Sequence, residues 1–313
     1  MEQQPEKIKR VERLNETPKE WRFFRERILD QFENKTDGLD IERVNEFIAS
    51  QGLSSTDILF IDFKDVPRLS KILRPYGLAD AFRQSTKGVR IPELNLAIVA
   101  RNPVREQLNG RIYTEGVAVH ESTHGSHKGS FVKYGCETYV PRLGFMLQKS
   151  HDDRAVPYSG TFLEEGFAEI MKGEYLEKHM SEKEKDRLLE VLGLPEKTPL
   201  SREVTVSFQS KSGEITETVM PIKYLYIESE NSVVCSASSP AASALEIAWK
   251  KYPELRSAMM ESRGDESKLK EIPKIFEKIS PGLYSKLQKI FEADSYHFSL
   301  GSNIIVKKIN DSK

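Results

Sequence analysis

Apolar residues recur every three or four positions along much of the chain, which is the spacing of one face of an α-helix. Trp21, Phe24 and Ile28 show this spacing near the N-terminus. Together with capping residues and helix breakers, this spacing predicts helices over 18–32, 39–48, 140–147, 161–179 and 181–192, and one that begins at a cap at Thr114. Residues 67–82 predict one or two short helices with a break at 75–77, and beyond Pro240 helices are expected over 245–259, 269–279 and 281–290.

Two segments instead alternate between apolar and polar residues, and a third is a short, mainly apolar run, and these patterns predict β-strands. Residues 57–63 indicate a short strand or buried turn, and residues 89–101 are the strongest strand candidate in the first half. Pro92 near the start of that segment favours an edge strand. Residues 202–228 predict a β-hairpin around a turn at 211–214, whereas residues 102–110 are expected to form a loop.

These elements predict an α+β protein with three parts. The first is a polar and helical N-terminal extension over residues 1–35, and the second is a mixed lobe over residues 36–195. The third is a mainly helical C-terminal lobe over residues 196–313, with the hairpin at 202–228 and helices at 240–293.

Composition narrows the class of protein. With 38% hydrophobic and 30% charged residues, the chain is expected to be globular and soluble rather than disordered. No apolar run approaches the roughly 20 residues that span a bilayer, so no membrane association is expected. The formal net charge is −1, which gives no electrostatic reason for binding nucleic acid.

The N-terminus and the cysteines bear on location. The first residues are charged throughout and lack the apolar core of a secretory signal. Two cysteines, Cys136 and Cys235, are too few for a disulfide-stapled scaffold. Both features predict a cytoplasmic protein with free thiols.

Residues 120–124 have the sequence His-Glu-Ser-Thr-His, which is the pattern H-E-x-x-H. His120 and His124 are four residues apart, so on a helix their imidazoles face the same side and can hold one Zn²⁺ at about 2.0–2.1 Å. Glu121 points about 100° away around the helix and can take a proton from a metal-bound water.

A second acidic motif, Glu165-Gly-Phe-Ala-Glu169, follows after 40 intervening residues (125–164). Together the two motifs resemble the gluzincin clan of zinc metallopeptidases, which includes the thermolysin-like and aminopeptidase-like enzymes. The resemblance implies a zincin-like lobe in which Glu165 is the third zinc ligand and Glu169 orients the first histidine. One helical turn apart, the two carboxylates share a face, which suits these roles.

The chain departs from this clan in three respects. The interval between the motifs is longer than usual, which leaves Glu164 as an alternative third ligand. A G-x-M-E-N motif is absent from the sequence, so recognition of a free α-amine is not indicated. A D-x-D-x-D-G calcium loop is absent as well.

Other zincin types fit less well. A metzincin would need a histidine where the chain has Ser130, and a deformylase-like site would need a cysteine before the helix, whereas Cys136 follows it. His127 lies two turns beyond His120 on the same face, and it is expected outside the ligand set or beside the substrate.

Peptide hydrolysis also needs a donor for the negative oxygen of the transition state. The preferred candidates are Tyr296 and His297, which follow the last predicted helix, and the alternatives are Tyr224, Tyr226, Tyr252 and Tyr284. As the resemblance implies, the strand at 94–100 is expected at a sheet edge, where an extended substrate can pair with it.

The sequence therefore predicts a zinc-dependent peptidase, and more specifically an endopeptidase. Glu121 is its expected general base, and a peptide or protein is its expected substrate. Two alternatives stand beside it. One is a zinc-stabilised binding or regulatory protein with little or no turnover, and the other is a zinc-free interaction domain.

Overall fold

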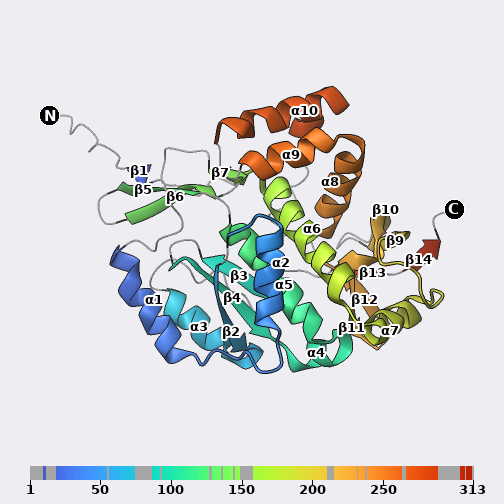
Figure 1. The fold of residues 1–313 in the computed structure, drawn as a ribbon, viewed down its shortest axis with the longest axis horizontal. Helices are drawn as coiled ribbons and strands as arrows, with labels where there is room; N and C mark the ends of the chain where they lie inside the picture. The colour runs from blue at the N-terminus through green and yellow to red at the C-terminus, as the bar shows by residue number, and fades with distance from the viewer. Residues whose placement is uncertain are drawn as a thin grey trace.

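The chain folds into helices and several small β-sheets, which is a mixed α+β arrangement (Figure 1). The computed structural model describes residues 10–11, 19–54, 56–74, 87–91, 94–126, 129–134, 137–143, 145–148, 158–209, 215–230, 232–236, 238–262, 266–287, 304–306 and 308–311. Within these residues, no helix is both long and apolar enough to cross a bilayer.

A three-stranded sheet with the order β2-β4-β3 positions the helix of the H-E-x-x-H motif. Its strands are β2 (Asp57–Asp62), β3 (Gly88–Ile91) and β4 (Leu96–Arg101). β4 pairs in parallel with β2 and antiparallel with β3. The central strand β4 is buried from residue 96 to residue 100, because both faces of the sheet are covered.

Two sequence expectations fail in this sheet. The segment 89–101 forms two strands rather than one, and Asn95 adopts a left-handed conformation (φ 47°) directly before β4. The segment 94–100 is not an edge strand, since β4 lies between two neighbours and β3 lies at the edge. A continuous apolar run such as Leu96–Ala100 is typical of a strand buried on both faces.

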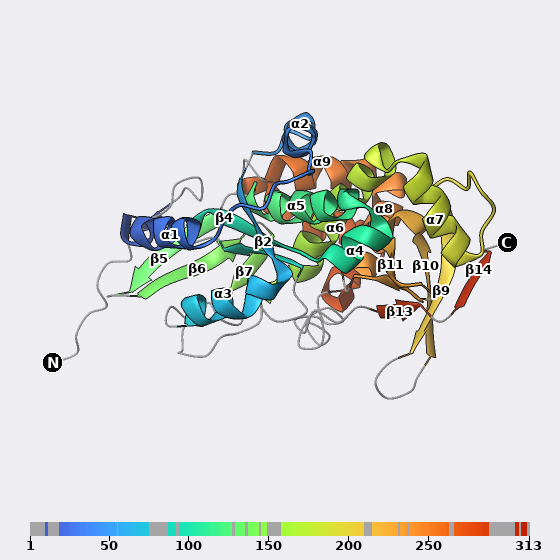
Figure 2. The same cartoon turned by 90° about the horizontal axis from the view of Figure 1, so that it is seen from below.

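Helices cover the two faces of this sheet (Figure 2). The helices α1 (Lys19–Gln31) and α3 (Val66–Leu73) share one hydrophobic cluster with alternate residues of the strands, such as Leu59 and Ile98. The helices α2 (Ile41–Ser50) and α5 (Arg111–Gly125) belong to a larger cluster that includes Phe60 and Val99. The sheet is thus the middle layer between two sets of helices.

Two further expectations fail around α5. The predicted loop at 102–110 contains α4 (Pro103–Asn109), which Asn102 caps by accepting hydrogen bonds from the amides of Val104 and Arg105. Proline in the first turn also suits a helix start. α5 begins at Arg111, so Thr114 is not its cap.

α6 (Thr161–His179) packs against α5 on one side and α8 (Ser239–Lys251) on the other (Figure 1). The close approach of α5 and α6 depends on Gly116, where an added Cβ would lie 3.0 Å from Leu176 Cδ2 and 3.4 Å from Lys172 Cγ. The predicted helices at 161–179 and 181–192 are confirmed, the second as α7 (Glu182–Leu192) with a capping box at Ser181.

The remaining strands form three small sheets. Their orders are β1-β5-β6-β7-β8, β10-β9-β14 and β11-β12-β13. The strands are β1 (Arg10–Val11), β5 (Gly129–Tyr134), β6 (Glu137–Leu143), β7 (Met146–Gln148), β8 (Tyr158–Ser159), β9 (Glu203–Gln209), β10 (Ile215–Pro221), β11 (Leu225–Ser229), β12 (Ser232–Cys235), β13 (Ile304–Val306) and β14 (Lys308–Asp311). The hairpin of β9 and β10 confirms the prediction for 202–228, whereas the helix predicted at 140–147 is wrong, because β6 pairs there with β5 and β7.

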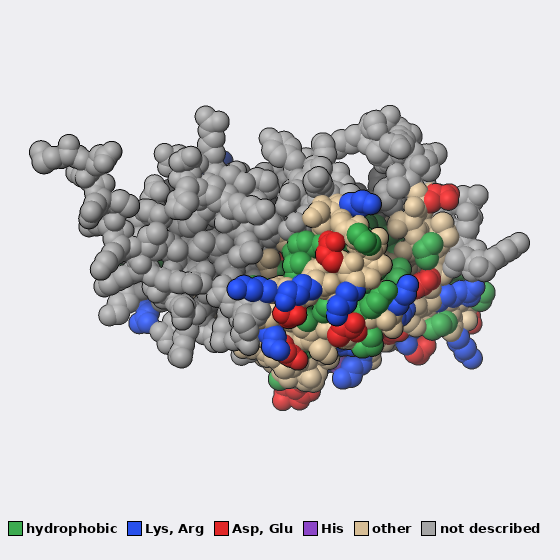
Figure 3. Space-filling model, turned by 90° about the horizontal axis from the view of Figure 1, so that it is seen from above, with side chains coloured by type: hydrophobic (Ala, Val, Ile, Leu, Met, Phe, Trp, Pro, Cys, Tyr) green, Lys and Arg blue, Asp and Glu red, His purple; other side chains and the backbone are tan. Residues whose placement is uncertain are grey.

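Helices α9 (Pro253–Ser262) and α10 (Glu271–Ile279) follow α8. Figure 3 views the molecule from the side on which these helices lie in Figure 1, and on the described part of that face Lys and Arg side chains are interspersed with Asp and Glu. This mixture agrees with the near-zero net charge of the chain.

Candidate metal centre

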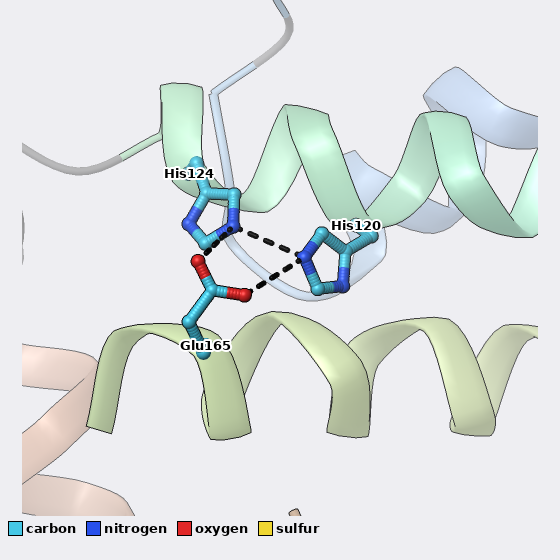
Figure 4. Close-up of side chains that lie close together, drawn as sticks. All are labelled: His120, His124 and Glu165. Carbon is cyan, nitrogen blue, oxygen red and sulfur yellow. Dashed lines mark hydrogen bonds and ion pairs between the residues drawn. The ribbon is translucent and has the colours of Figure 1, made fainter. Parts of the chain in front are cut away.

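Three side chains converge between α5 and α6 in an arrangement that could hold a metal ion (Figure 4). His120 and His124 come from α5, one turn apart, and Glu165 comes from the first turns of α6. Their donor atoms all lie within 4.8 Å of one another. The predicted grouping of these three residues is therefore present in the structure.

The separations of these donors suit one small cation. Nε2 of His120 lies 3.1 Å from Nε2 of His124, and the two Glu165 oxygens lie 3.5 and 3.6 Å from these nitrogens. Donors at about 2.0–2.1 Å around a tetrahedral Zn²⁺ would be about 3.3–3.4 Å apart. The observed distances lie on both sides of that value, so the site fits a zinc-sized ion with little rearrangement.

Each imidazole also has a carboxylate on its other nitrogen. Nδ1 of His120 lies 3.1 Å from Oε2 of Glu169, which matches the orienting role expected for Glu169. Nδ1 of His124 lies 2.9 Å from Oε1 of Glu164. Both contacts leave Nε2 as the nitrogen that faces the third donor, Glu165.

Glu164 is thus a hydrogen-bond partner of His124, and the group that could hold a metal contains Glu165. Its side chain is fully buried, and its second oxygen accepts a hydrogen bond of 2.9 Å from the amide of Phe145. Sequence reasoning missed this role. The sequence alone does not distinguish two adjacent glutamates, and only the position of α6 beside α5 separates their contacts.

Histidines and glutamates in this group shift one another's pKa values toward their charged forms. Burial alone would lower the pKa of His120, but hydrogen bonds to Glu165 and Glu169 outweigh it and raise the pKa to about 10. Burial would raise the pKa of Glu165, yet the His124 and His120 charges lower it. The pKa of Glu169 is likewise held well below its usual range, despite burial, by Lys172 and His120. The carboxylates of Glu165 and Glu169 therefore stay ionised and can face a cation.

Glu121 lies apart from the three donors and faces the edge strand β3. It is 7% exposed, and burial raises its pKa above the ordinary value. An added Cβ at Gly88 of β3 would lie 2.7 Å from Glu121 Cγ and 2.8 Å from Oε1. Gly88 therefore provides the space that the carboxylate of Glu121 occupies.

The other predicted residues divide into two groups. His127, Tyr296 and His297 lie outside the described residues. Two of the alternative donors contact residues other than the three metal-binding side chains. The Tyr226 hydroxyl accepts a hydrogen bond from Lys87, and the Tyr284 ring packs against Phe162 and Phe276.

Comparison with known proteins assigns no family to the chain. No protein-family model, curated protein or solved structure matches it. The donor geometry between α5 and α6 therefore carries the functional interpretation.

Proposed function

We propose that the protein is a zinc-dependent peptidase of the gluzincin type. The observation that carries this proposal is the convergence of His120 and His124 of α5 with Glu165 of α6, in a helix α5 that also carries Glu121. Two imidazoles and one carboxylate form a donor set that catalytic zinc sites use with one position left open. A resident Zn²⁺ supplies Lewis-acid activation of water and of a substrate carbonyl.

Glu121 is the general base in this proposal. Its carboxylate accepts a proton from the attacking water and passes it to the leaving amine. The packing of Glu121 against Gly88 restricts the positions that the carboxylate can take, which favours proton transfer from a water held in one place.

Glu164 and Glu169 fix the two imidazoles. Each carboxylate accepts the Nδ1–H of one histidine, so Nε2 is the nitrogen that each imidazole can offer to a metal once its own proton has left. Because the imidazoles are already oriented before the ion binds, less conformational entropy is lost when they bind it.

An extended peptide is the substrate class that the proposal favours. β3 lies at the edge of its sheet in the described part of the chain, and Gly88 brings it beside Glu121. A peptide that pairs with β3 as an additional strand would pass close to the general base.

A zinc-stabilised binding protein with little or no turnover is the second candidate. The burial of Glu121, which is 7% exposed, favours it, because a substrate and the attacking water must reach the general base.

Digestion of a peptide library by wild type and by Glu121→Gln distinguishes these functions. We expect wild type to contain one Zn²⁺ per chain and to cleave peptides, and Glu121→Gln to keep the metal and lose about 10²- to 10⁴-fold in rate. Glu190→Gln, on the exposed surface of α7, is the matched control and should cleave as wild type does. Metal-loaded wild type that cleaves no better than Glu121→Gln would support the binding protein, and a wild type without metal affinity would contradict both.

A further inference from the structure

Lys172 is a buried ammonium one helical turn beyond Glu169 on α6. Its side chain is 6% exposed, and Nζ lies 3.1 Å from Oε1 of Glu169. The other oxygen of that carboxylate, Oε2, lies 3.1 Å from Nδ1 of His120. A single carboxylate therefore joins Lys172 to one of the candidate metal ligands.

Contacts along its length hold the Lys172 side chain. Nζ lies 5.4 Å from the ring centroid of Tyr113 and 5.7 Å from that of Tyr226, at distances where a cation is attracted to aromatic rings. Its Cγ lies close to Gly116 of α5. These contacts leave the ammonium one position, beside Glu169.

A purely structural role explains this arrangement poorly. Burying an ammonium is costly, and an apolar replacement of similar volume often stabilises a fold as well as a buried ion pair does. A carboxylate that must keep one orientation does need a fixed cation. The terminal torsion of a glutamate is broad, so a carboxylate that is bonded at one oxygen can rotate, whereas one that is bonded at both cannot.

We propose that Lys172 is a positioning residue of the metal centre, which holds Glu169 so that its second oxygen stays on His120. The proposal rests on the proposed function in one respect, namely that the centre binds a metal. Ser239 also donates to Oε1 of Glu169, at 3.2 Å, and the Ser236 side chain hydrogen-bonds the same carboxylate, but a neutral hydroxyl forms a weaker bond than an ammonium does. Lys172 is accordingly the main restraint on that oxygen.

Zn²⁺ affinity of the full chain, measured by competition with a chromophoric chelator, tests the proposal. Lys172→Met should weaken Zn²⁺ binding about tenfold, because losing an outer partner of a ligating histidine costs roughly 10- to 100-fold in affinity. Co²⁺ in place of Zn²⁺ should show an altered visible spectrum in Lys172→Met, which a loss of stability alone would not produce.

Lys223 provides a matched control on another element. Its side chain is 5% exposed, and it forms ion pairs with Glu246 at 2.7 Å and Glu177 at 3.4 Å, neither of which belongs to the metal centre. Lys223→Met should lower stability to a similar degree and leave Zn²⁺ affinity unchanged. Equal affinities of Lys172→Met and Lys223→Met would overturn the proposal.

A double-mutant cycle tests whether Lys172 acts through Glu169. In a Glu169→Gln background, Lys172→Met should have no further effect on Zn²⁺ affinity, whereas a full, additive loss would overturn the proposed route. Should Lys172→Met fail to fold, Lys172→Leu carries the same comparison, since it also removes the donor to Glu169. A wild type that binds no Zn²⁺ overturns the metal centre itself, and that result is read before any substitution is made.

Discussion

Glu164 and Glu165 are adjacent in the chain, yet their carboxylates contact different atoms of the centre. Successive residues of an α-helix point about 100° apart, so one carboxylate reaches the space between the two Nε2 atoms and the other reaches the far side of His124. The amide of Phe145 holds the second oxygen of Glu164. The result is that both imidazoles, not one, are fixed through Nδ1.

This arrangement predicts the effect of Glu164→Gln. The amide side chain can still accept one hydrogen bond but has lost the charge that favours the ligating tautomer of His124. We expect Zn²⁺ affinity to fall roughly 10- to 100-fold. Competition with a chelator measures it, and Glu190→Gln on α7 serves again as the control. An affinity equal to that of wild type would mean that His124 needs no partner at Nδ1.

At the scale of elements, a second buried network connects α2 to the helices α5 and α6. Glu115 of α5 is 1% exposed and accepts hydrogen bonds of 2.5 Å from both Arg43 of α2 and Tyr175 of α6. Its other oxygen accepts the amide of Asp40 at 2.8 Å, just before α2 begins. Three helices therefore share one carboxylate at a point away from the metal ligands.

Removing the tyrosine hydroxyl should weaken the fold but not the metal centre. Tyr175→Phe leaves Glu115 with one partner fewer while the ring packing remains. We expect the free energy of unfolding to fall by about 1–3 kcal/mol, the usual cost of a lost buried hydrogen bond to a charged group. Denaturant unfolding of the metal-free protein measures the loss. A large decrease in Zn²⁺ affinity of the folded variant would contradict this separation of roles.

At the scale of the whole molecule, the candidate metal centre lies between α5 and α6, two helices that are distant in sequence. His124 and Glu165 are separated by residues 125–164, and a metal that binds both can do so strongly only in the folded protein. Binding to the folded state alone stabilises it, by about 2.7 kcal/mol when free metal is at 100 times its dissociation constant.

Metal removal should therefore lower thermal stability. We expect a strong chelator to reduce the Tm of wild type and added Zn²⁺ to restore it, as followed by circular dichroism. His120→Ala lacks a ligand, so its Tm should respond much less to either treatment. A wild-type Tm that is indifferent to both would argue that no ion binds at this centre.

How far the sequence predicts this molecule depends on the range of the interactions involved. The helix α6 and the hairpin of β9 and β10 follow from local periodicity and turn residues, and the His120 and His124 pair follows from helical spacing alone. The pairing of Glu165 with them needed a resemblance between motifs, since no local rule connects residues that far apart.

The predictions that are wrong concern features that depend on contacts between distant segments. Whether β4 is central or at the edge depends on which strands pair with it, and residues 137–143 become a strand because β5 lies beside them. The role of Glu164 likewise depends on the placement of α6 against α5. Pairing partners and helix packing are tertiary, so the sequence pattern of one segment does not contain them.

Gly116 gives the close packing of α5 and α6 a chemical consequence. It lies one turn before His120, and a methyl group there would lie 3.0 Å from Leu176 Cδ2, so Leu176 or the helix that carries it would have to move by a few tenths of an ångström. If the helix moves, the space between the imidazoles on α5 and the carboxylate on α6 widens by a similar amount. Because proteins discriminate between cations partly by cavity size, we expect the cation preference of the proposed centre to depend in part on a hydrogen atom of a residue that is not among its ligands.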